Sequence, residues 1–303
     1  MNTLEIKNVT KKYGDFTAVD SVSLSVNKGE IFGLLGPNGA GKSSTIRMIM
    51  NITVPDNGEI HFFGEPFRNE FKNRIGYLPE ERGLYPKMRV IEQLKFLGEM
   101  KAMRGSEAKK SGYEWLEKVG LAEWAKKPVN ELSKGMAQKV QFIGTIIHNP
   151  EIIIMDEPFS GLDPVNSKFL KDILLELKNQ NKCIILSTHL MESAEKLCGR
   201  IGLINTGKLV LEGNIQELKQ KFSKNSVILK YNGDSALIKQ LSEIKYINDF
   251  GNYMEINLNK EVKKSDFFKK LAELPLEITK FETTETSLED IFIQHVGKRE
   301  KNV

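Results

Sequence analysis

Short continuous apolar runs are the clearest hydrophobic pattern in the first two thirds of the chain. Residues 31–35, 152–156 and 183–187 form such runs and are almost entirely apolar. Runs of this length are typical of strands that are buried on both faces of a parallel sheet. Residues 4–9 predict an edge strand, and residues 19–26, where apolar and polar positions alternate, predict another.

Helical periodicity lies between these strands. A glycine-rich segment, residues 36–41, leads into a predicted helix over residues 42–50. Residues 88–120 have apolar positions at helical spacing, with Trp115 on the face expected to be buried. Strands that alternate with helices indicate an α/β fold built on a parallel sheet.

A different pattern follows residue 213. We predict strands at 227–231, 244–248, 253–258 and 276–281, and helices at 235–241, 267–274 and 288–296. Ser287 and Asp290 fit a capping box for the last helix. The β-α-β-β-α-β order predicts a small α+β, ferredoxin-like appendage after a polar linker at 219–226. The expected domains are therefore 1–218 and 219–303.

Composition places the chain among globular proteins. Of 303 residues, 40% are hydrophobic and 28% are charged. The apolar runs are far below the roughly 18 residues of a membrane span, and the N-terminus shows no secretory pattern. We expect a cytoplasmic chain whose membrane function, if any, comes from a partner. The net charge of +4 without a dense basic block gives no indication of nucleic-acid binding. Cys183 and Cys198 are expected to be buried thiols.

A phosphate-binding motif of the form G-x-x-x-x-G-K-[ST] follows the first apolar run. It consists of Gly36, Pro37, Asn38, Gly39, Ala40, Gly41, Lys42 and Ser43. Its glycines let backbone N–H groups surround a phosphate, and the helix that follows directs its positive end at the anion. Lys42 is predicted to bind the β- and γ-phosphates, Ser43 to bind Mg²⁺, and Ser44 to contact a neighbouring phosphate.

Two acids end the apolar run at 152–156. Asp156 and Glu157 are expected at the carboxyl edge of the sheet, where open α/β folds bind ligands. Asp156 is the expected outer-sphere Mg²⁺ partner, and Glu157 is the expected general base that polarises the attacking water.

These motifs, with others that follow in order, resemble the nucleotide-binding subunit of ATP-binding cassette (ABC) transporters over roughly residues 4–218. Leu132-Ser-Lys-Gly-Met136 resembles the signature loop, although Lys134 and Met136 depart from the common form LSGGQ. Residues 160–163 resemble the D-loop. The resemblance implies a P-loop NTPase fold: a RecA-like core with an ABC helical subdomain and an antiparallel β subdomain.

The resemblance assigns further site residues. Ser133 and Gly135 would cap ATP bound by a second subunit, and Asp163 would lie at the dimer interface. His189 would contact the γ-phosphate, and Tyr13 would stack on adenine. Glu80 takes the place of a usual glutamine, as a Mg²⁺ ligand that responds to the γ-phosphate and adds negative charge.

The resemblance implies ATP and Mg²⁺ as cofactors, and a homodimer or a dimer with a close relative that encloses two ATP molecules. A separate transmembrane permease would be the partner, on the inner face of the cell membrane. Glu80, the signature and the appendage resemble ATPase subunits of sodium-extrusion or drug-export type. The substrate would then be exported Na⁺ or an exported drug-like solute, and import is the alternative direction.

Two other classes of protein stay open at this point. A soluble ABC ATPase acting on ribosomes or DNA is disfavoured by the single cassette, the absence of sustained heptads and the modest charge. A regulatory module with a vestigial ATPase is disfavoured by the intact Lys42, Asp156 and Glu157.

Overall fold

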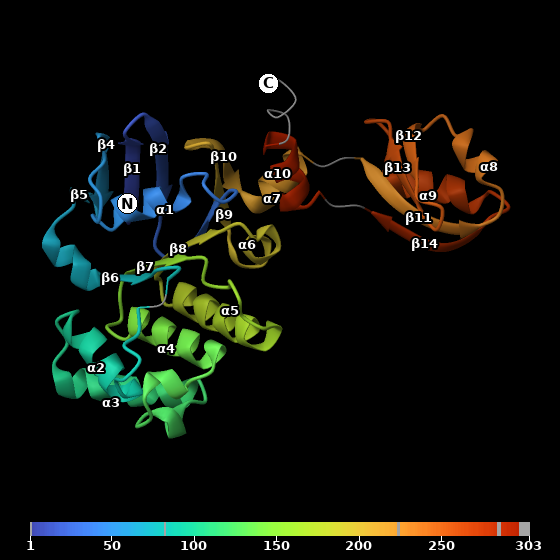
Figure 1. Ribbon diagram of the computed structural model, residues 1–303. Helices are drawn as coiled ribbons and strands as arrows, with labels where there is room; N and C mark the ends of the chain where they lie inside the picture. The colour runs from blue at the N-terminus through green and yellow to red at the C-terminus, as the bar shows by residue number, and fades with distance from the viewer. Residues whose placement is uncertain (1, 82, 223–224, 284–285, 297–303) are drawn as a thin grey trace. The chain divides into compact units, whose positions relative to one another are not determined.

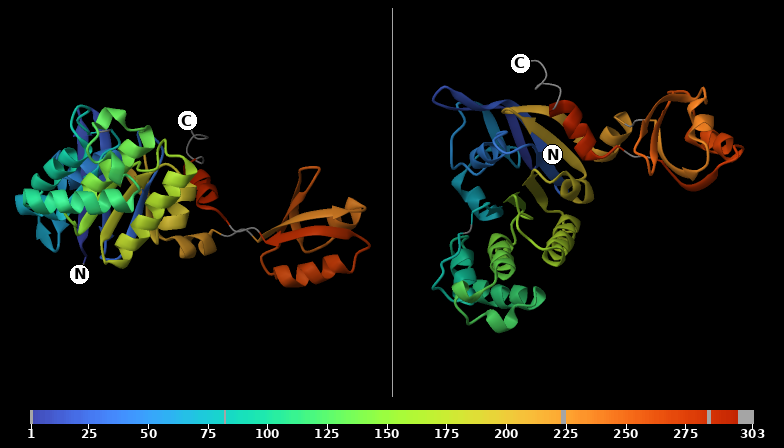
Figure 2. Two further views of the ribbon diagram at one scale, coloured as in Figure 1. Left: turned by 90° about the horizontal axis from the view of Figure 1, so that it is seen from below. Right: turned by 45° about the vertical axis from the view of Figure 1, so that its right-hand side comes forward.

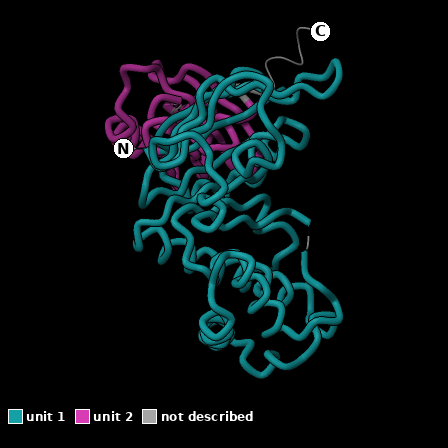
Figure 3. The backbone as a smooth tube through the Cα atoms, turned by 90° about the vertical axis from the view of Figure 1, so that its left-hand side faces the viewer, with its two compact units in different colours: residues 1–215 teal, residues 216–303 magenta. Residues whose placement is uncertain are grey.

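The computed structural model describes residues 2–81, 83–222, 225–283 and 286–296. Residues 223 and 224 of the predicted linker lie outside this range, as do residues 82 and 297–303. The chain divides into two compact units, residues 1–215 and 216–303 (Figure 3). The predicted boundary at 218/219 falls inside helix α7 (Ile215–Lys221), which also occupies the first part of the predicted linker.

Unit 1 contains two sheets and a group of helices (Figure 1). Its strands are β1 (Leu4–Tyr13), β2 (Phe16–Val26), β3 (Ile31–Leu35), β4 (Asn57–Phe62), β5 (Glu65–Pro66), β6 (Ile75–Leu78), β7 (Ile152–Asp156), β8 (Cys183–Thr188), β9 (Arg200–Asn205) and β10 (Lys208–Asn214). Its α-helices before α7 are α1 (Lys42–Ile49), α2 (Val90–Glu99), α3 (Gly105–Lys118), α4 (Lys134–Ile146), α5 (Pro164–Asn179) and α6 (Met191–Leu197). Short 3₁₀ helices span Asn69–Arg74, Ala122–Trp124 and Val129–Glu131.

The central sheet has the order β10-β9-β3-β8-β7-β6. Neighbours from β9 to β6 run parallel, and only β10 is antiparallel to its neighbour. The apolar runs β3, β7 and β8 are buried along their whole length, as the pattern predicted. Their carboxyl ends meet at one edge, because Asp156 pairs with Ser187 and Leu35 with Thr188.

The second sheet corrects one expectation. Its order is β2-β1-β4-β5, so β2 is an edge strand, whereas β1 lies between β2 and β4. The prediction that residues 4–9 form an edge strand was wrong because β4 was not foreseen. Most positions of β4 are exposed or half-buried, and the strand therefore has little apolar pattern. Helix α1 contacts β2 and β7 and joins the core that the two sheets share.

Helices α2, α3 and α4 form a separate layer with its own core (green in Figure 2). The predicted helical stretch 88–120 is two helices, interrupted at residues 100–104, where Ala102 has a φ of 63°. Trp115 is partly buried against this core. The layer reaches the central sheet through α4, which contacts β6. Residues 75–78 form that strand.

Unit 2 is an antiparallel sheet with helices. Its elements are β11 (Ser226–Asn232), α8 (Ser235–Lys239), β12 (Ile244–Asp249), β13 (Met254–Leu258), α9 (Lys264–Ala272), β14 (Glu277–Thr283) and α10 (Leu288–Val296). The sheet order β12-β13-β11-β14 is that of a ferredoxin-like β-α-β-β-α-β unit. Before α10, Ser287 Oγ accepts from Asp290 N at 3.1 Å and Asp290 Oδ2 accepts from Ser287 N at 3.1 Å, as the capping box predicted.

No helix within the described ranges is long and apolar enough to cross a membrane. Cys183 and Cys198 are buried free thiols, as expected. Burial raises the pKa of Cys198 to about 12 and raises that of Cys183 further.

Candidate functional site

The loop between β3 and α1 leaves backbone donors available at the start of the helix. Gly41 is the N-cap residue, with a φ of 109°, and no side chain caps α1. A Cβ at Gly41 would lie 2.4 Å from the carbonyl oxygen of Ala18, so only glycine fits. The first turn contains no acidic residue that would compete with an anion. The uncapped N–H groups and the helix dipole therefore favour a phosphate here.

A cavity of about 340 Å³ opens over this loop. Its lining combines the predicted phosphate, metal and base residues with part of the β1–β2 hairpin: Tyr13, Phe16, Ala18, Asn38, Gly39, Ala40, Gly41, Lys42, Ser43, Ser44, Glu80, Asp156 and Glu157. The structure thus brings together residues from four separate segments of the chain. The lining combines aromatic rings at the hairpin with phosphate-binding and acidic groups, which is the composition a nucleoside triphosphate requires.

Lys42 is buried, and its ammonium group is held by the loop itself. Its Nζ donates to the carbonyl oxygens of Gly36 at 2.8 Å and Pro37 at 3.2 Å. Glu157 Oε1 lies 3.7 Å from the same nitrogen. Gly36 and Pro37 do not line the cavity, so their contribution is to orient this lysine.

Asp156 is 4% exposed, and its Oδ1 has no hydrogen-bond partner. The hydroxyl of Ser187, the β8 residue paired with Asp156, is likewise buried without a partner. Asp156 lines the cavity, and its unsatisfied carboxylate oxygen indicates a site for a cation or its water shell. Among the described residues, no group of three His, Cys, Asp or Glu side chains forms a metal cage. The donors available, Ser43, Glu80 and Asp156, fit Mg²⁺, which keeps water and phosphate ligands.

Glu157 is the most constrained acid of the site. Its Oε1 accepts from the backbone N–H of His189 at 3.0 Å and lies 2.8 Å from His189 Nδ1, and its Oε2 accepts from Thr188 Oγ1 at 3.1 Å. Its φ of 48° is the left-handed conformation that side chains rarely adopt. His189 does not line the cavity, but it contacts Glu157, which does.

Tyr13 and Phe16 are paired residues at the turn between β1 and β2. Their side chains are 44% and 63% exposed, and both line the cavity. Exposed aromatic rings at a cavity mouth are suited to stacking on a planar base. Sequence reasoning found Tyr13 and missed Phe16, although a second aromatic residue just beyond the Gly14 turn was visible in the sequence.

The signature and D-loop residues lie outside this cavity. Ser133 caps α4 by accepting from Met136 N at 3.3 Å. Asp163 caps α5 by accepting from Asn166 N at 2.9 Å. The backbone and side-chain N–H donors of Asn166 lower the pKa of the Asp163 carboxyl. Gly135 lies close to Asn166. Ser133, Gly135 and Asp163 therefore do not contribute to the nucleotide cavity of their own chain.

A second cavity of about 230 Å³ lies beside the first. The two share Glu80, Asp156 and Glu157. The second cavity is further lined by Leu78, Pro79, Lys134, Gln138, Gln141, Pro158 and Ser160. Sequence reasoning did not single out Gln138, Gln141 or Thr188, because each acts through a contact that no local motif encodes.

A parallel strand, a glycine-rich loop with its lysine and two acids at the end of another strand of the same sheet together define a P-loop NTPase. Family comparison narrows this class. A family model described as ABC transporter matches residues 19–160, and a model for the C-terminal domain of DrrA1-3-like ATP-binding proteins matches residues 213–296.

Individual relatives agree with this assignment. The uncharacterized ABC transporter ATP-binding protein YhaQ of Bacillus subtilis is 42% identical over 97% of this chain and 98% of its own. The linearmycin resistance ATP-binding protein LnrL of the same organism is 34% identical over 97% and 98% of the two chains. The dimeric structure of the bacterial ABC transporter cassette MJ0796 aligns with a TM-score of 0.65 and 27% identity, covering 70% of this chain and 98% of that one.

The chain therefore belongs to the ATP-binding proteins of ABC transporters and carries a C-terminal domain of the DrrA type. It is an ATPase of the ABC cassette fold, which converts ATP and water to ADP and phosphate.

Proposed function

We propose that two copies of this chain, or one copy and a close relative, associate head to tail around two ATP molecules. The support is the position of Ser133 and Gly135, which lie outside the cavity of their own chain and so remain available to a partner's nucleotide. The MJ0796 cassette, a related protein, has a dimeric structure. In this arrangement Asp163 lies at the interface while its carboxylate caps α5.

The observation that carries the catalytic proposal is the fixed carboxylate of Glu157 at the floor of the cavity. Glu157 accepts a proton from the attacking water, and the contact from His189 keeps the acid oriented while the histidine responds to the γ-phosphate. Lys42 and the loop N–H groups bind the phosphates, and Tyr13 stacks on the base. When bound to Ser43, Asp156 and Glu80, Mg²⁺ would offset charge on the phosphates.

Hydrolysis would power export through a separate membrane-spanning partner, with this chain held on the inner face of the membrane. A drug-like solute is the substrate class we propose, because the relative LnrL is described as a linearmycin resistance protein. Na⁺ is the alternative substrate, and the test distinguishes it from a drug-like solute.

The test uses everted membrane vesicles from cells that produce this chain together with a multi-span membrane protein that co-purifies with it. ATP-dependent uptake of a fluorescent amphipathic drug, lost with Glu157→Gln, is the expected result. Uptake of radioactive Na⁺ and not of the drug would identify Na⁺ as the substrate in place of a drug-like solute. Absence of both, with the chain sedimenting with ribosomes, would overturn the transport proposal.

A further inference from the structure

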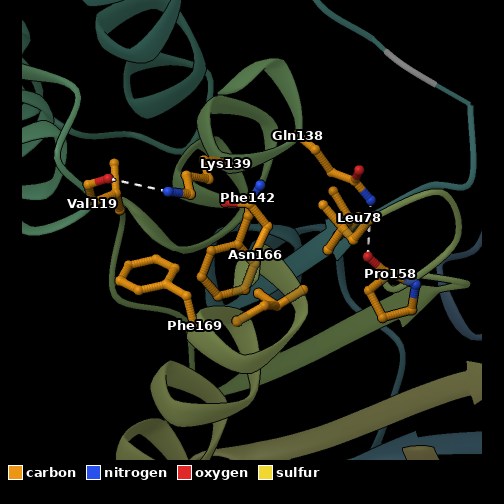
Figure 4. Close-up of a pocket in the computed structure, with 10 residues that line it drawn as sticks. Leu78, Val119, Gln138, Lys139, Phe142, Pro158, Asn166 and Phe169 are labelled. Atoms are coloured by element: carbon orange, nitrogen blue, oxygen red, sulfur yellow. Dashed lines mark hydrogen bonds between the residues drawn. The ribbon is translucent and has the colours of Figure 1, made fainter. Parts of the chain in front are cut away.

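Helix α4, which is capped by the signature residue Ser133, carries two glutamines on one side. Gln138 and Gln141 are separated by three positions and therefore point the same way. Gln138 Nε2 donates to the carbonyl oxygen of Pro158 at 2.9 Å, a contact drawn in Figure 4. Gln141 Nε2 donates to the carbonyl oxygen of Glu81 at 3.2 Å.

Each of these carbonyl groups belongs to the residue that directly follows an acid of the site. Pro158 follows Glu157, and Glu81 follows Glu80. Both glutamines line the 230 Å³ cavity that contains these acids, and neither lines the nucleotide cavity. The glutamines therefore reach the acids through the backbone and do not touch the space that the nucleotide fills.

Stability alone gives a poor account of these amides. Gln141 is only 9% exposed, and the Oε1 atom of Gln138 is buried without a partner. A buried, unsatisfied amide oxygen destabilises a fold, and an unbranched apolar side chain of similar length fills the same space without that cost. The feature that only the amides provide is the pair of directed bonds to the two backbone positions.

We propose that Gln138 and Gln141 are positioning residues, which tie the signature helix to the backbone beside Glu157 and Glu80. The inference rests on the proposed function of those acids. At a rise of about 1.5 Å per residue, the two glutamines lie roughly 8 Å and 12 Å along the helix axis from Ser133. A displacement of α4 when Ser133 engages the partner's ATP is thus transmitted to both acids of its own site. ATP hydrolysis at the two sites is therefore coupled.

The test replaces each glutamine by methionine, which keeps the length and removes the donor. ATP affinity should stay within about twofold, because the nucleotide cavity is unchanged. The kcat for ATP hydrolysis should fall about tenfold per variant, the equivalent of one lost hydrogen bond, and the Hill coefficient for ATP should fall toward one. Gln180→Met, at an exposed amide that donates to Glu176 at 3.4 Å, is the matched control and should behave as the unaltered chain.

Gln138→Glu and Gln141→Glu provide a second pair of variants, isosteric with the original side chains, in case a methionine variant folds poorly. They also remove the donor and should lower kcat in the same way. An unchanged kcat and Hill coefficient in folded variants overturns the inference, as does a loss that appears only in KM. If the unaltered chain binds ATP but never hydrolyses it, the proposed function fails instead, so the two failures are distinguishable.

Discussion

His189 makes two contacts with the same carboxylate oxygen of Glu157. Its Nδ1 lies 2.8 Å from Glu157 Oε1, and its backbone N–H donates to the same oxygen at 3.0 Å. The other oxygen of Glu157 accepts from Thr188. The carboxylate is therefore oriented by the chain itself, before any nucleotide contributes a contact.

Glu157→Gln should lower kcat for ATP hydrolysis by about 100-fold or more, because an amide cannot accept the proton of the attacking water. ATP affinity should be retained, since Lys42 and the phosphate loop are unchanged. Steady-state phosphate release and equilibrium titration with ATP measure the two quantities. Glu176→Gln, at a surface acid paired with Lys118 at 2.6 Å, is the control. A Glu157→Gln protein with ordinary turnover would remove Glu157 from the base role.

Thr188→Val should lower kcat by about tenfold with KM nearly unchanged, because the isosteric side chain no longer donates to Glu157. Thr188→Ser retains the hydroxyl and should recover most of the lost activity. Since Thr188 is 1% exposed and does not line the nucleotide cavity, a defect confined to KM would contradict this role. The measurement is the kcat and KM of each variant under identical conditions.

Lys42→Ala should weaken ATP binding by at least about tenfold, since a buried ammonium group beside the phosphate loop is lost. Calorimetric titration with a slowly hydrolysed ATP analogue in excess Mg²⁺ gives the affinity. Chelation of Mg²⁺ should weaken binding further in the unaltered chain. Lys196→Ala, at a surface lysine paired with Glu192, serves as the control. Equal affinity of Lys42→Ala and the control would place the phosphate elsewhere.

His148 makes the fold sensitive to acid. Burial, with a smaller effect of Lys101, lowers its pKa from 6.5 to about 4. Between these values the unfolded chain binds the proton more tightly than the folded chain, so the free energy of unfolding rises with pH. The contribution of neutral His148 to that free energy is lost as pH falls from 6.5 toward 4. The loss is at most on the order of 3 kcal/mol.

His148→Gln removes the titrating group and keeps an amide donor for Ile75 O, the partner of His148 Nε2 at 3.3 Å. Its stability should therefore fall less between neutral and acid pH than that of the unaltered chain. Urea unfolding can be followed by the fluorescence of Trp115 and Trp124, which both pack in the helical layer of the same unit. Parallel stability curves for the two proteins would show that His148 is not responsible.

The sequence predicted the elements whose pattern is decided locally. β3, β7 and β8 are continuous apolar runs because both faces of the central sheet are covered, and the phosphate loop is a contiguous motif. β4 was missed because its side chains are mostly exposed or half-buried. The break between α2 and α3 was missed because apolar spacing continues across it, while the backbone at Ala102 turns to positive φ.

Contacts between distant segments were beyond sequence reasoning for a different reason. The unpaired oxygens of Asp156 and Ser187 become visible only once β7 and β8 lie side by side in a known register. The donation from Gln141 to Glu81 depends on how α4 packs against a loop sixty positions earlier. Residue type alone classifies such glutamines as ordinary surface-helix residues.

The aromatic rings of Tyr13 and Phe16, which both line the cavity, have a consequence for nucleobase selectivity. The three hairpin residues that line the cavity are Tyr13, Phe16 and Ala18, and none of them carries an amide or carboxylate side chain that could read a base edge. Stacking accepts any base, since every base has a π-face. The chain should therefore hydrolyse GTP with a kcat/KM within about tenfold of that for ATP, and the energy supply of the transporter would follow the purine triphosphate pool and not adenine alone.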